Sequence, residues 1–288
     1  MRNGLRINGR KKKRVPATNL TSVRVGGPVR YLIDVYDLRS LRNLLAWAKK
    51  RGIAYRVIGS GTNLIFPDRG YDGLIIRLGG SFKRLWFKDQ VIAGCGIVLK
   101  DLIERLIKRG YGGMEPLYGI PGTLGGGIKG NCGAFGVSIS DFIDRIFILA
   151  PDGEEMMFDR KRIGFGYRRS RLLPSQIITF ALLRLKKGGS ITKARGYLKR
   201  RLEKIPEGWS AGCIFKNPEG KIAGRLIERC GLKDFQIGGA RVSGRHANFI
   251  INDGTATSSD IIRLIRYVRQ MVRRRFGITL ELEVEVVR

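Results

Sequence analysis

The sequence has few of the residues that build metal sites and disulfide frameworks. It contains four cysteines, none in a C-x-x-C pair, and one histidine among 288 residues. A structural zinc site needs several such ligands at close spacing, and disulfide frameworks belong to shorter chains that are denser in cysteine. We therefore expect no metal ion and no disulfide. Each cysteine is first interpreted as a small buried apolar residue.

Long apolar runs are also missing. No segment approaches the roughly 18 consecutive apolar residues that a membrane-spanning helix needs. The first 14 residues are basic and no apolar run follows them, so they lack the pattern of a secretory signal. These absences predict a cytoplasmic protein. A hydrophobic content of 43% indicates a folded chain and excludes general disorder.

Acidic residues are the third scarce class. The chain has 24 Asp and Glu against 55 Lys and Arg, which gives a formal net charge of +31. Seven of the positive charges lie in the first 14 residues, and the remaining +24 is spread without a dominant block. A nucleic-acid-binding protein needs such charge for phosphates, but an enzyme with polyanionic substrates or any protein of a basic proteome would show it too. The spread favours the second interpretation. No stretch interleaves aromatic and basic residues as an RNA-binding sheet does.

Helical and strand patterns alternate along the chain. Apolar residues recur at helical spacing over residues 38–48, 102–107 and 261–276, and the last of these helices follows a capping box at 257–260. Residues 280–286 alternate strictly between apolar and acidic, which is typical of a strand with one buried face. The sequence therefore predicts an α+β fold.

The first glycine segment, Gly59–Asn63, follows a predicted strand. It does not match the dinucleotide-binding fingerprint, because Pro67 and then Gly70 come before any helix can begin. A glycine-rich turn of this kind can still bind a phosphate through consecutive backbone N–H groups. Most such turns bind nothing, so both interpretations stay open for this segment alone.

The second glycine segment, Gly119–Gly136, contains eight glycines in 18 residues. Each glycine costs about 0.5–1 kcal/mol in backbone entropy relative to alanine. Close approach of the backbone to a large ligand explains this concentration better than a loop without a function.

Together the two segments resemble the FAD-binding domain of the vanillyl-alcohol-oxidase type. Residues 18–287, taken in order, resemble the UDP-N-acetylenolpyruvoylglucosamine reductase family in its shorter form, since only 41 residues separate Arg168 from Ser210. The matching stretches are residues 21–28, 59–64, 119–136, 165–168, 210–218, 223–228, 246–252 and 276–284.

The resemblance implies an FAD-binding domain in two α/β subdomains and a C-terminal α+β substrate-binding domain. We place the subdomains at 15–82 and 83–188 and the substrate-binding domain at 189–288, with residues 1–14 as a disordered basic tail. The last strand, 279–287, would carry a catalytic glutamate and can return toward the FAD domain.

The implied reaction belongs to peptidoglycan precursor synthesis: NADPH reduces non-covalently bound FAD, and the enolpyruvyl group of UDP-N-acetylglucosamine-enolpyruvate then receives the hydride at C3. The resemblance assigns protonation of C2 to Cys213, where the family usually has serine, and stabilisation of the intermediate to Arg168 and Glu283. From the residues alone, Arg168 could belong to a solvated cluster with Arg169 and Arg171. Glu283 could equally lie on a solvated acidic strand face.

The other implied site residues fall into two groups. Those expected to bind FAD are Gly59, Ser60, Gly61, Thr62, Asn63, Leu64, Gly119, Ile120, Pro121, Gly122, Thr123, Gly126, Gly127, Asn131, Gly133, Ala134 and Phe135. Those expected to contact the substrate are Tyr167, Arg201, Lys204, Lys216, Asn217 and His246. A lone histidine is more often a structural residue, so that alternative stays open for His246.

Two other functions remain as alternatives. One is an FAD-linked alcohol or sugar oxidase of the same fold superfamily, although no histidine that could bind flavin covalently lies near either glycine segment. The other is a basic nucleic-acid-binding protein. The sequence does not give the oligomeric state, for which a monomer is the working expectation.

Overall fold

The computed structural model describes residues 5–288, which divide into two compact units. Unit 1 contains the residues up to Lys13, Tyr31–Ser60 and Asp72–Arg200, and unit 2 contains Arg14–Arg30, Gly61–Tyr71 and Arg201–Arg288. The three consecutive domains that we expected from the sequence differ from this division, because the chain passes between the units several times. The reason is long-range packing: Val23, Val25 and Ile65 are buried in the same core as Phe215 and Leu280.

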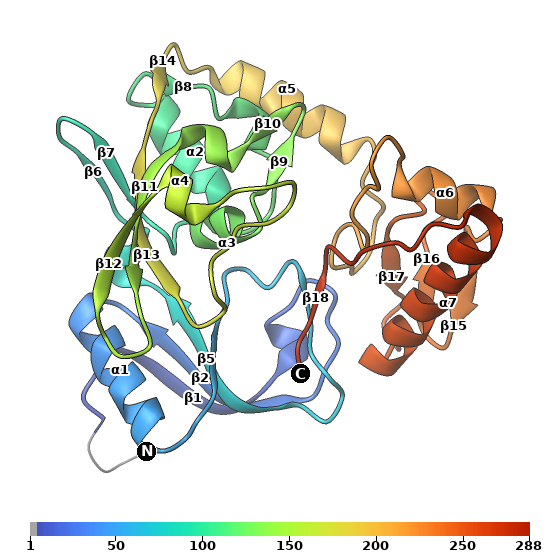
Figure 1. The fold of residues 1–288 in the computed structure, drawn as a ribbon, viewed down its shortest axis with the longest axis horizontal. Helices are drawn as coiled ribbons and strands as arrows, with labels where there is room; N and C mark the ends of the chain where they lie inside the picture. The colour runs from blue at the N-terminus through green and yellow to red at the C-terminus, as the bar shows by residue number, and fades with distance from the viewer. Residues whose placement is uncertain (1–4) are drawn as a thin grey trace. The chain divides into compact units, whose positions relative to one another are not determined.

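Unit 1 has two larger sheets and two short strand pairs, and the first larger sheet has the strand order β1-β2-β5-β3. Its strands are β1 (Gly9–Pro16), β2 (Pro28–Val35), β5 (Tyr71–Leu78) and β3 (Tyr55–Val57). Helix α1 (Leu38–Lys50) begins at Asp37, whose side chain accepts the Ser40 N–H at 2.7 Å. The apolar side of α1 packs on this sheet in one buried cluster (Figure 1).

The second sheet of unit 1 has the order β12-β11-β13-β7-β6, and its neighbours are all antiparallel. Its strands are β6 (Leu85–Phe87), β7 (Val91–Gly94), β11 (Ile143–Leu149), β12 (Glu155–Asp159) and β13 (Ile177–Leu183). The helices of this region are α2 (Leu99–Ile107), α3 (Leu124–Lys129), α4 (Arg160–Ile163) and α5 (Ile191–Leu202). Its short strand pairs are β8 (Tyr111–Gly112) with β14 (Lys186–Lys187), and β9 (Gly133–Ala134) with β10 (Val137–Ser138).

Helix α5 explains why the boundary that we expected at residue 188 is not where unit 1 ends. Ala194 of α5 is fully buried in the core of the second sheet, and Leu198 packs against the same core. The basic helix therefore belongs to unit 1 through its apolar side, and unit 1 continues to Arg200.

Unit 2 combines a small antiparallel sheet with two helices (Figure 1). The sheet has β15 (Gln236–Ile237), β16 (Ala240–Val242) and β17 (Ile250–Asn252), and the helices are α6 (Ala223–Arg229) and α7 (Ser258–Phe276). The predicted capping box is confirmed: Thr257 caps α7, and Gly277 ends it in the left-handed conformation with φ of +69°. Both signals are local in sequence, which is why they predict the ends of the helix well.

The C-terminal strand is shorter than the alternating pattern predicted. Only Glu285–Val286 forms a regular strand, β18, which pairs in parallel with β4 (Leu64–Ile65). The alternation of burial holds in part: Leu280 and Val284 are buried and Glu281 and Glu285 are exposed, but Leu282 and Glu283 are both half-buried.

The expectation of a disordered tail over residues 1–14 is wrong for the part that the structure describes, because residues 9–16 form β1. A Cβ at Gly9 would lie 2.0 Å from the backbone oxygen of Asp34, so glycine lets β1 lie directly against β2. Strand pairing uses backbone groups and needs no apolar side chain. The basic side chains of β1 remain largely exposed at the sheet edge, where charge discourages pairing with other chains.

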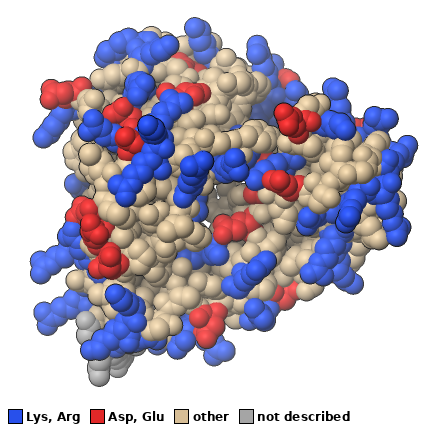
Figure 2. Space-filling view, viewed as in Figure 1, with Lys and Arg blue, Asp and Glu red and all other residues tan. Residues whose placement is uncertain are grey.

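Positive charge is spread over the surface. Figure 2 shows Lys and Arg side chains over the whole visible face, with acidic groups scattered among them. No helix within residues 5–288 is both long enough and apolar enough to cross a membrane.

We expect deletion of residues 1–14 to lower the thermal unfolding midpoint by about 5 °C or more. The deletion removes Leu5 from the α1 core and most of β1, whose backbone hydrogen bonds contribute about 0.5–1.5 kcal/mol each. Calorimetry checks this. The control replaces Arg10, Lys12 and Lys13 by threonine, which keeps the strand and should leave the midpoint near that of the parent. An unchanged midpoint in the deletion would show that β1 contributes nothing to stability.

Candidate active site

The two glycine segments meet inside unit 1 at Gly59 and Thr123. A Cβ at Gly59 would lie 2.4 Å from the Thr123 side-chain oxygen, so no other residue fits there without a shift. Thr123 in turn caps α3, because its Oγ1 accepts the Gly126 N–H at 3.3 Å. No pattern in the sequence predicts a contact between these segments, and the structure supplies one.

The glycines of these segments serve two different purposes. Three of them allow close packing within the protein, since an added Cβ would lie 1.8 Å from Leu20 O at Gly61, 3.0 Å from Cys95 O at Gly125 and 3.0 Å from Cys132 Sγ at Gly127. Gly126 is exposed, and a Cβ there would meet only Thr123 Oγ1, at the ordinary distance of 3.6 Å.

The protein itself therefore does not require glycine at 126. Exposed backbone at Gly126 lets a large ligand approach closely, and Ser60 is exposed as well. The residues present thus fit an FAD site. The other predicted residues in the second segment, Gly119 to Gly122, lie between a 3₁₀ turn at Glu115–Leu117 and α3.

Arg168 lies in a tight turn of unit 1 with an unusual backbone. Gly166 and Arg169 exchange backbone hydrogen bonds of 3.0 and 3.3 Å, and Arg168 between them has φ of +52°. The Arg168 guanidinium donates through Nη2 to Gly133 O at 2.7 Å and is half-buried, whereas Arg169 is exposed. Arg168 is therefore held against the second glycine segment, which argues against its belonging to a solvated basic cluster.

The neighbours of Arg168 differ in exposure. Tyr167 is 55% exposed, and its ring centroid lies 5.6 Å from the Arg168 guanidinium carbon. Phe135, in the β9–β10 hairpin, is 45% exposed and has φ of +52°. Its ring packs on Tyr197 of α5 at 5.0 Å between centroids. Asn131 is buried, with both ends of its side-chain amide hydrogen-bonded inside the protein.

Unit 2 brings Cys213 and Glu283 into neighbouring segments. The Glu283 N–H donates to the carbonyl of Ile214, the residue after Cys213, at 2.8 Å, and Phe215 bridges to Leu282. On the other side, the Asn63 side chain donates through Nδ2 to Glu283 O at 2.9 Å, and the Glu285 N–H donates to Asn63 O at 3.0 Å. A residue of the first glycine segment thus contacts the predicted catalytic glutamate directly.

Glu283 also differs from the two other acids of its segment. Glu281 and Glu285 are exposed, and Glu281 pairs with Lys216 at 3.4 Å. Glu283 is half-buried. Burial therefore distinguishes Glu283 from the two exposed acids of its segment. The resemblance selects the same residue.

Sequence reasoning missed Asn248, which holds the Cys213 segment. Its side chain accepts the Phe215 N–H at 3.0 Å and donates to Phe215 O at 2.8 Å, while its backbone oxygen accepts the Ile214 N–H at 2.8 Å. Asn248 is 4% exposed. It lies in the matching stretch 246–252, but no signal in the sequence indicates its partner.

The predicted substrate residues of unit 2 are only partly available. Asn217 accepts the Ala223 N–H at the start of α6 at 3.0 Å, so its side-chain oxygen is already used. Arg201 lies in the last turn of α5, and Lys204 is exposed two residues after its end. Burial lowers the pKa of His246, with nearby Lys204 and Lys233 acting in the same direction, and its ring packs on Phe249 at 4.9 Å. His246 is therefore neutral near pH 7.

The remaining features concern possible metal ligands and the state of the four cysteines. Within residues 5–288 no group of three or more His, Cys, Asp or Glu could hold a metal ion. All four cysteines are free thiols. Burial raises the pKa of Cys95, which is part of the core, so the interpretation as an apolar residue is confirmed there.

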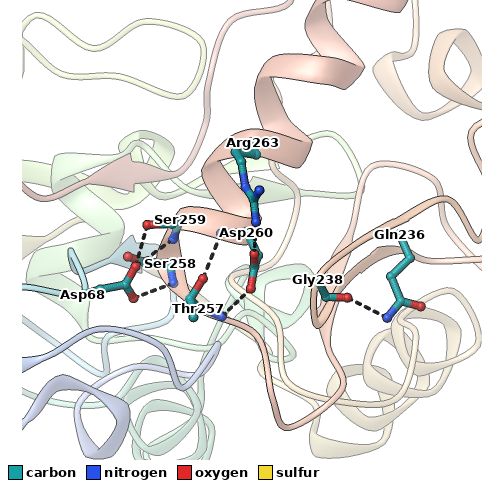
Figure 3. Close-up of polar contacts among 8 residues, drawn as sticks. All are labelled: Asp68, Gln236, Gly238, Thr257, Ser258, Ser259, Asp260 and Arg263. Carbon is teal, nitrogen blue, oxygen red and sulfur yellow. Dashed lines mark hydrogen bonds and ion pairs between the residues drawn. The ribbon is translucent and has the colours of Figure 1, made fainter.

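Asp68 fixes the segment after the first glycine motif to helix α7 (Figure 3). Its carboxylate accepts the backbone N–H groups of Ser258 at 2.8 Å and Ser259 at 3.0 Å, and the Ser259 hydroxyl at 2.6 Å. Thr257 accepts the next N–H, from Asp260. The first N–H groups of α7 are thus satisfied by two residues far apart in the sequence.

The same contacts change the acidity of both carboxyl groups. Partial burial acts to raise the pKa of Asp68, but the hydrogen bonds from Ser259 and Ser258 outweigh it and hold the pKa below its usual value. Hydrogen bonds from Thr257 lower the pKa of Asp260 to about 2. The pKa values of Asp68 and Asp260 are both lower in the folded state than in the unfolded state. The two ionised carboxylates therefore contribute fully to the free energy of unfolding above a pH of about 4, and this contribution is lost as the pH falls through the lowered pKa values.

We expect Asp68→Asn to lower the free energy of unfolding by about 0.5–2 kcal/mol at pH 7, the usual value of a helix cap. Denaturant titrations of parent and variant between pH 2 and 7 measure it, and their difference should shrink below a pH of about 4. Asp89→Asn is the control, since Asp89 is exposed in the turn between β6 and β7. Equal effects of the two substitutions would contradict the capping role.

Comparison with known proteins agrees with this arrangement. A model of the C-terminal domain of UDP-N-acetylenolpyruvoylglucosamine reductase matches residues 203–287, and a model of an FAD-binding domain matches residues 30–158. UDP-N-acetylenolpyruvoylglucosamine reductase 2 of Symbiobacterium thermophilum is 38% identical over 99% of this chain and 95% of its own length. The reductase of Thermotoga maritima is 38% identical over 92% of this chain and 95% of its own.

A solved structure supports the same assignment. The crystal structure of the reductase from Thermus caldophilus has a TM-score of 0.83 at 33% identity and covers 98% of this chain and 100% of that one. The predicted fold class, an FAD-binding domain followed by a C-terminal α+β domain, is confirmed. With identity of this level along nearly the whole chain, the protein belongs to the UDP-N-acetylenolpyruvoylglucosamine reductase family.

Proposed function

We propose that this protein is an FAD-dependent enzyme that uses NADPH to reduce UDP-N-acetylglucosamine-enolpyruvate to UDP-N-acetylmuramate. The observation that carries the proposal is the pairing of the Cys213 and Glu283 segments in unit 2, joined on one side to Asn63 of a glycine motif. In this arrangement a proton donor and a carboxyl group lie on neighbouring segments. Family membership supplies the substrate class.

The residues that would hold FAD lie in the two glycine segments. They are Gly59 to Leu64, Gly119 to Thr123, Gly126, Gly127 and the hairpin residues Gly133 to Phe135. The support is the contact of Gly59 with Thr123 and the exposed backbone at Gly126. The chemistry that bound FAD supplies is the transfer of a hydride from NADPH to C3 of the enolpyruvyl group.

Cys213 holds the proton that C2 receives. Its Sγ is the acidic group of the segment that Asn248 fixes through Ile214 and Phe215. A thiol is a far better proton donor near neutral pH than the serine hydroxyl usual in the family. The exchange of serine for cysteine therefore preserves the function of the position, and it makes the site oxidisable if the pKa of the thiol is lowered.

Arg168 and Glu283 stabilise the charge that develops on the substrate after hydride arrival. An arginine does so with a permanently charged planar donor, and a carboxyl group can donate when protonated or orient a neighbour when ionised. The hydrogen bond from Arg168 to Gly133 O and the two backbone hydrogen bonds of Glu283 keep both groups in place before substrate binds.

The anionic part of the substrate would be bound by basic groups. Arg201 and Lys204 are the candidates for the diphosphate, with Lys216 and Tyr167 for other parts of the substrate. The Asn217 oxygen is used at α6 and His246 is neutral, so their contributions would be limited to hydrogen bonds. A monomer in the cytoplasm remains part of this proposal.

We expect the purified protein to be yellow and to release its FAD into the supernatant on acid precipitation. Neither glycine segment contains histidine, and the one histidine of the chain packs on Phe249, so no histidyl anchor for flavin is evident, and Cys132 is the one cysteine within these segments. Absorption spectra of pellet and supernatant measure this. Colour that stays in the pellet would contradict non-covalent binding, and colourless protein that binds no added FAD would contradict the proposed function.

The sharpest expectation concerns Cys213, because protonation of C2 belongs only to the second half-reaction. In Cys213→Ala, NADPH should reduce the flavin at close to the parent rate, whereas reoxidation by the enolpyruvyl substrate should slow by roughly 10²–10⁴. Cys213→Ser should recover much of that loss. Stopped-flow absorbance follows both half-reactions on the same sample.

The comparison is internal, so a folding defect cannot imitate it. Unchanged reoxidation in Cys213→Ala would mean that the proton comes from another group. If both half-reactions slow together, Cys213 is a packing residue and not the donor.

A further inference from the structure

Asn131 is a buried residue with an unusual backbone and a side-chain amide that is hydrogen-bonded at both ends. It is 7% exposed and has φ of +43°. Its Nδ2 donates to Gly166 O at 2.8 Å, its Oδ1 accepts the Ser140 N–H at 3.3 Å, and its own N–H donates to Ile128 O at 3.2 Å. The orientation of the amide is determined, because a carbonyl can only accept and a backbone N–H can only donate.

The hydrogen bond to Gly166 joins the second glycine segment to the turn that carries Arg168. Gly166 begins that turn, whose backbone hydrogen bonds to Arg169 leave Arg168 near its tip. Two residues after Asn131, Gly133 O accepts from the Arg168 guanidinium at 2.7 Å. One short segment therefore contacts both the backbone of the turn and the side chain of Arg168.

Space at this contact is closely matched. A Cβ at Gly133 would lie 3.1 Å from Arg168 Nη1 and 2.6 Å from Val137 O. Glycine at 133 therefore allows the β9–β10 hairpin and the Arg168 guanidinium to pack this closely on the segment.

Backbone strain is concentrated in the same place. Of the six non-glycine residues with positive φ among residues 5–288, three are Asn131, Phe135 and Arg168. Such conformations persist only where surrounding contacts impose them, and they gather at functional sites. The hydrogen bonds of Asn131 are contacts of this kind.

We infer that Asn131, which the resemblance assigned to FAD binding, is instead a positioning residue for Arg168. It keeps the turn at Gly166–Arg169 in the conformation that presents the guanidinium, and its side chain does not contact FAD, since it is buried and its amide nitrogen and oxygen both bond to protein backbone. The inference rests on the proposed function in one respect: the reaction step that Asn131 is expected to affect is the reoxidation of the flavin, in which Arg168 takes part.

Two substitutions separate the contacts of the side chain. Asn131→Asp keeps the shape and the acceptor for Ser140 but removes the donor to Gly166. Asn131→Gly removes the whole side chain without adding charge, and both residues tolerate positive φ. In both variants we expect reoxidation by the enolpyruvyl substrate to slow by about 10–100-fold, with flavin reduction by NADPH within about 2-fold of the parent.

Asn252→Asp is the matched control. Asn252 is also buried, at 4% exposed, and its Nδ2 likewise donates to a backbone carbonyl, that of Val23, at 2.9 Å. The control loses a buried donor of the same kind in unit 2, the unit that does not contain Arg168. It should lower thermal stability without changing the ratio of the two half-reaction rates.

A double-mutant cycle with Arg168→Lys tests whether Asn131 acts through Arg168. If it does, adding Asn131→Asp to Arg168→Lys should slow reoxidation by less than about 3-fold further, because the group that it positions is already altered. Full additivity of the two effects would overturn the inference. So would a slowing in Asn252→Asp equal to that in Asn131→Asp.

Two readouts do not depend on turnover. The dissociation constant of FAD should be unchanged in Asn131→Asp, and a rise of 10-fold or more would show that Asn131 is a flavin ligand after all. Backbone amides of residues 165–171 should exchange hydrogen faster in Asn131→Asp than in the parent or in Asn252→Asp, and equal exchange would overturn the positioning role. If the parent itself is not reoxidised by the enolpyruvyl substrate, the proposed function fails, while these two measurements still decide the role of Asn131.

Discussion

The candidate site depends on the hydrogen bonding of one peptide segment from both sides. The Glu283 N–H donates to Ile214 O beside Cys213, and Glu283 O accepts from the Asn63 side chain of a glycine motif. These three segments are far apart in the sequence, and Asn63 and Glu283 are separated by 220 positions along the chain. The regular pairing of β4 with β18 covers only two residues on each strand, so these contacts, together with that short ladder, fix the position of Glu283.

Asparagine recurs as the residue that fixes irregular backbone next to the predicted catalytic groups. Asn63 donates to Glu283 itself, Asn248 to the residue two positions after Cys213, and Asn131 to the residue two positions before Arg168. The amide suits this purpose because it carries a donor and an acceptor but no charge, so it can be buried once both are satisfied. Arg168, Cys213 and Glu283 all lie outside regular strands and helices, where no backbone ladder could fix them.

The sequence predicted features whose causes are local and missed those whose causes are distant. The predicted capping box at Thr257 determines the start of α7 within a few residues and is observed, and Asp37 and Gly277 are local signals of the same kind. Strand β1 was missed because its pairing depends on the edge offered by β2 and not on its own basic side chains. The partners of Asn131 and Asn248 lie 35 and 33 positions away, and no pattern in the sequence specifies them.

The glycines between Gly119 and Gly136 are only partly explained by room for a ligand. The concentration between Gly119 and Gly136 was interpreted as room for a ligand, at about 0.5–1 kcal/mol for each glycine. In the structure, Gly125, Gly127 and Gly133 are required by contacts within the protein, whereas Gly126 is exposed and meets no close neighbour. Much of the entropic cost is therefore offset by close packing of backbone on backbone. That packing fixes the path of the segment, while at Gly126 the lack of a Cβ leaves the backbone exposed, as close approach of a ligand would require.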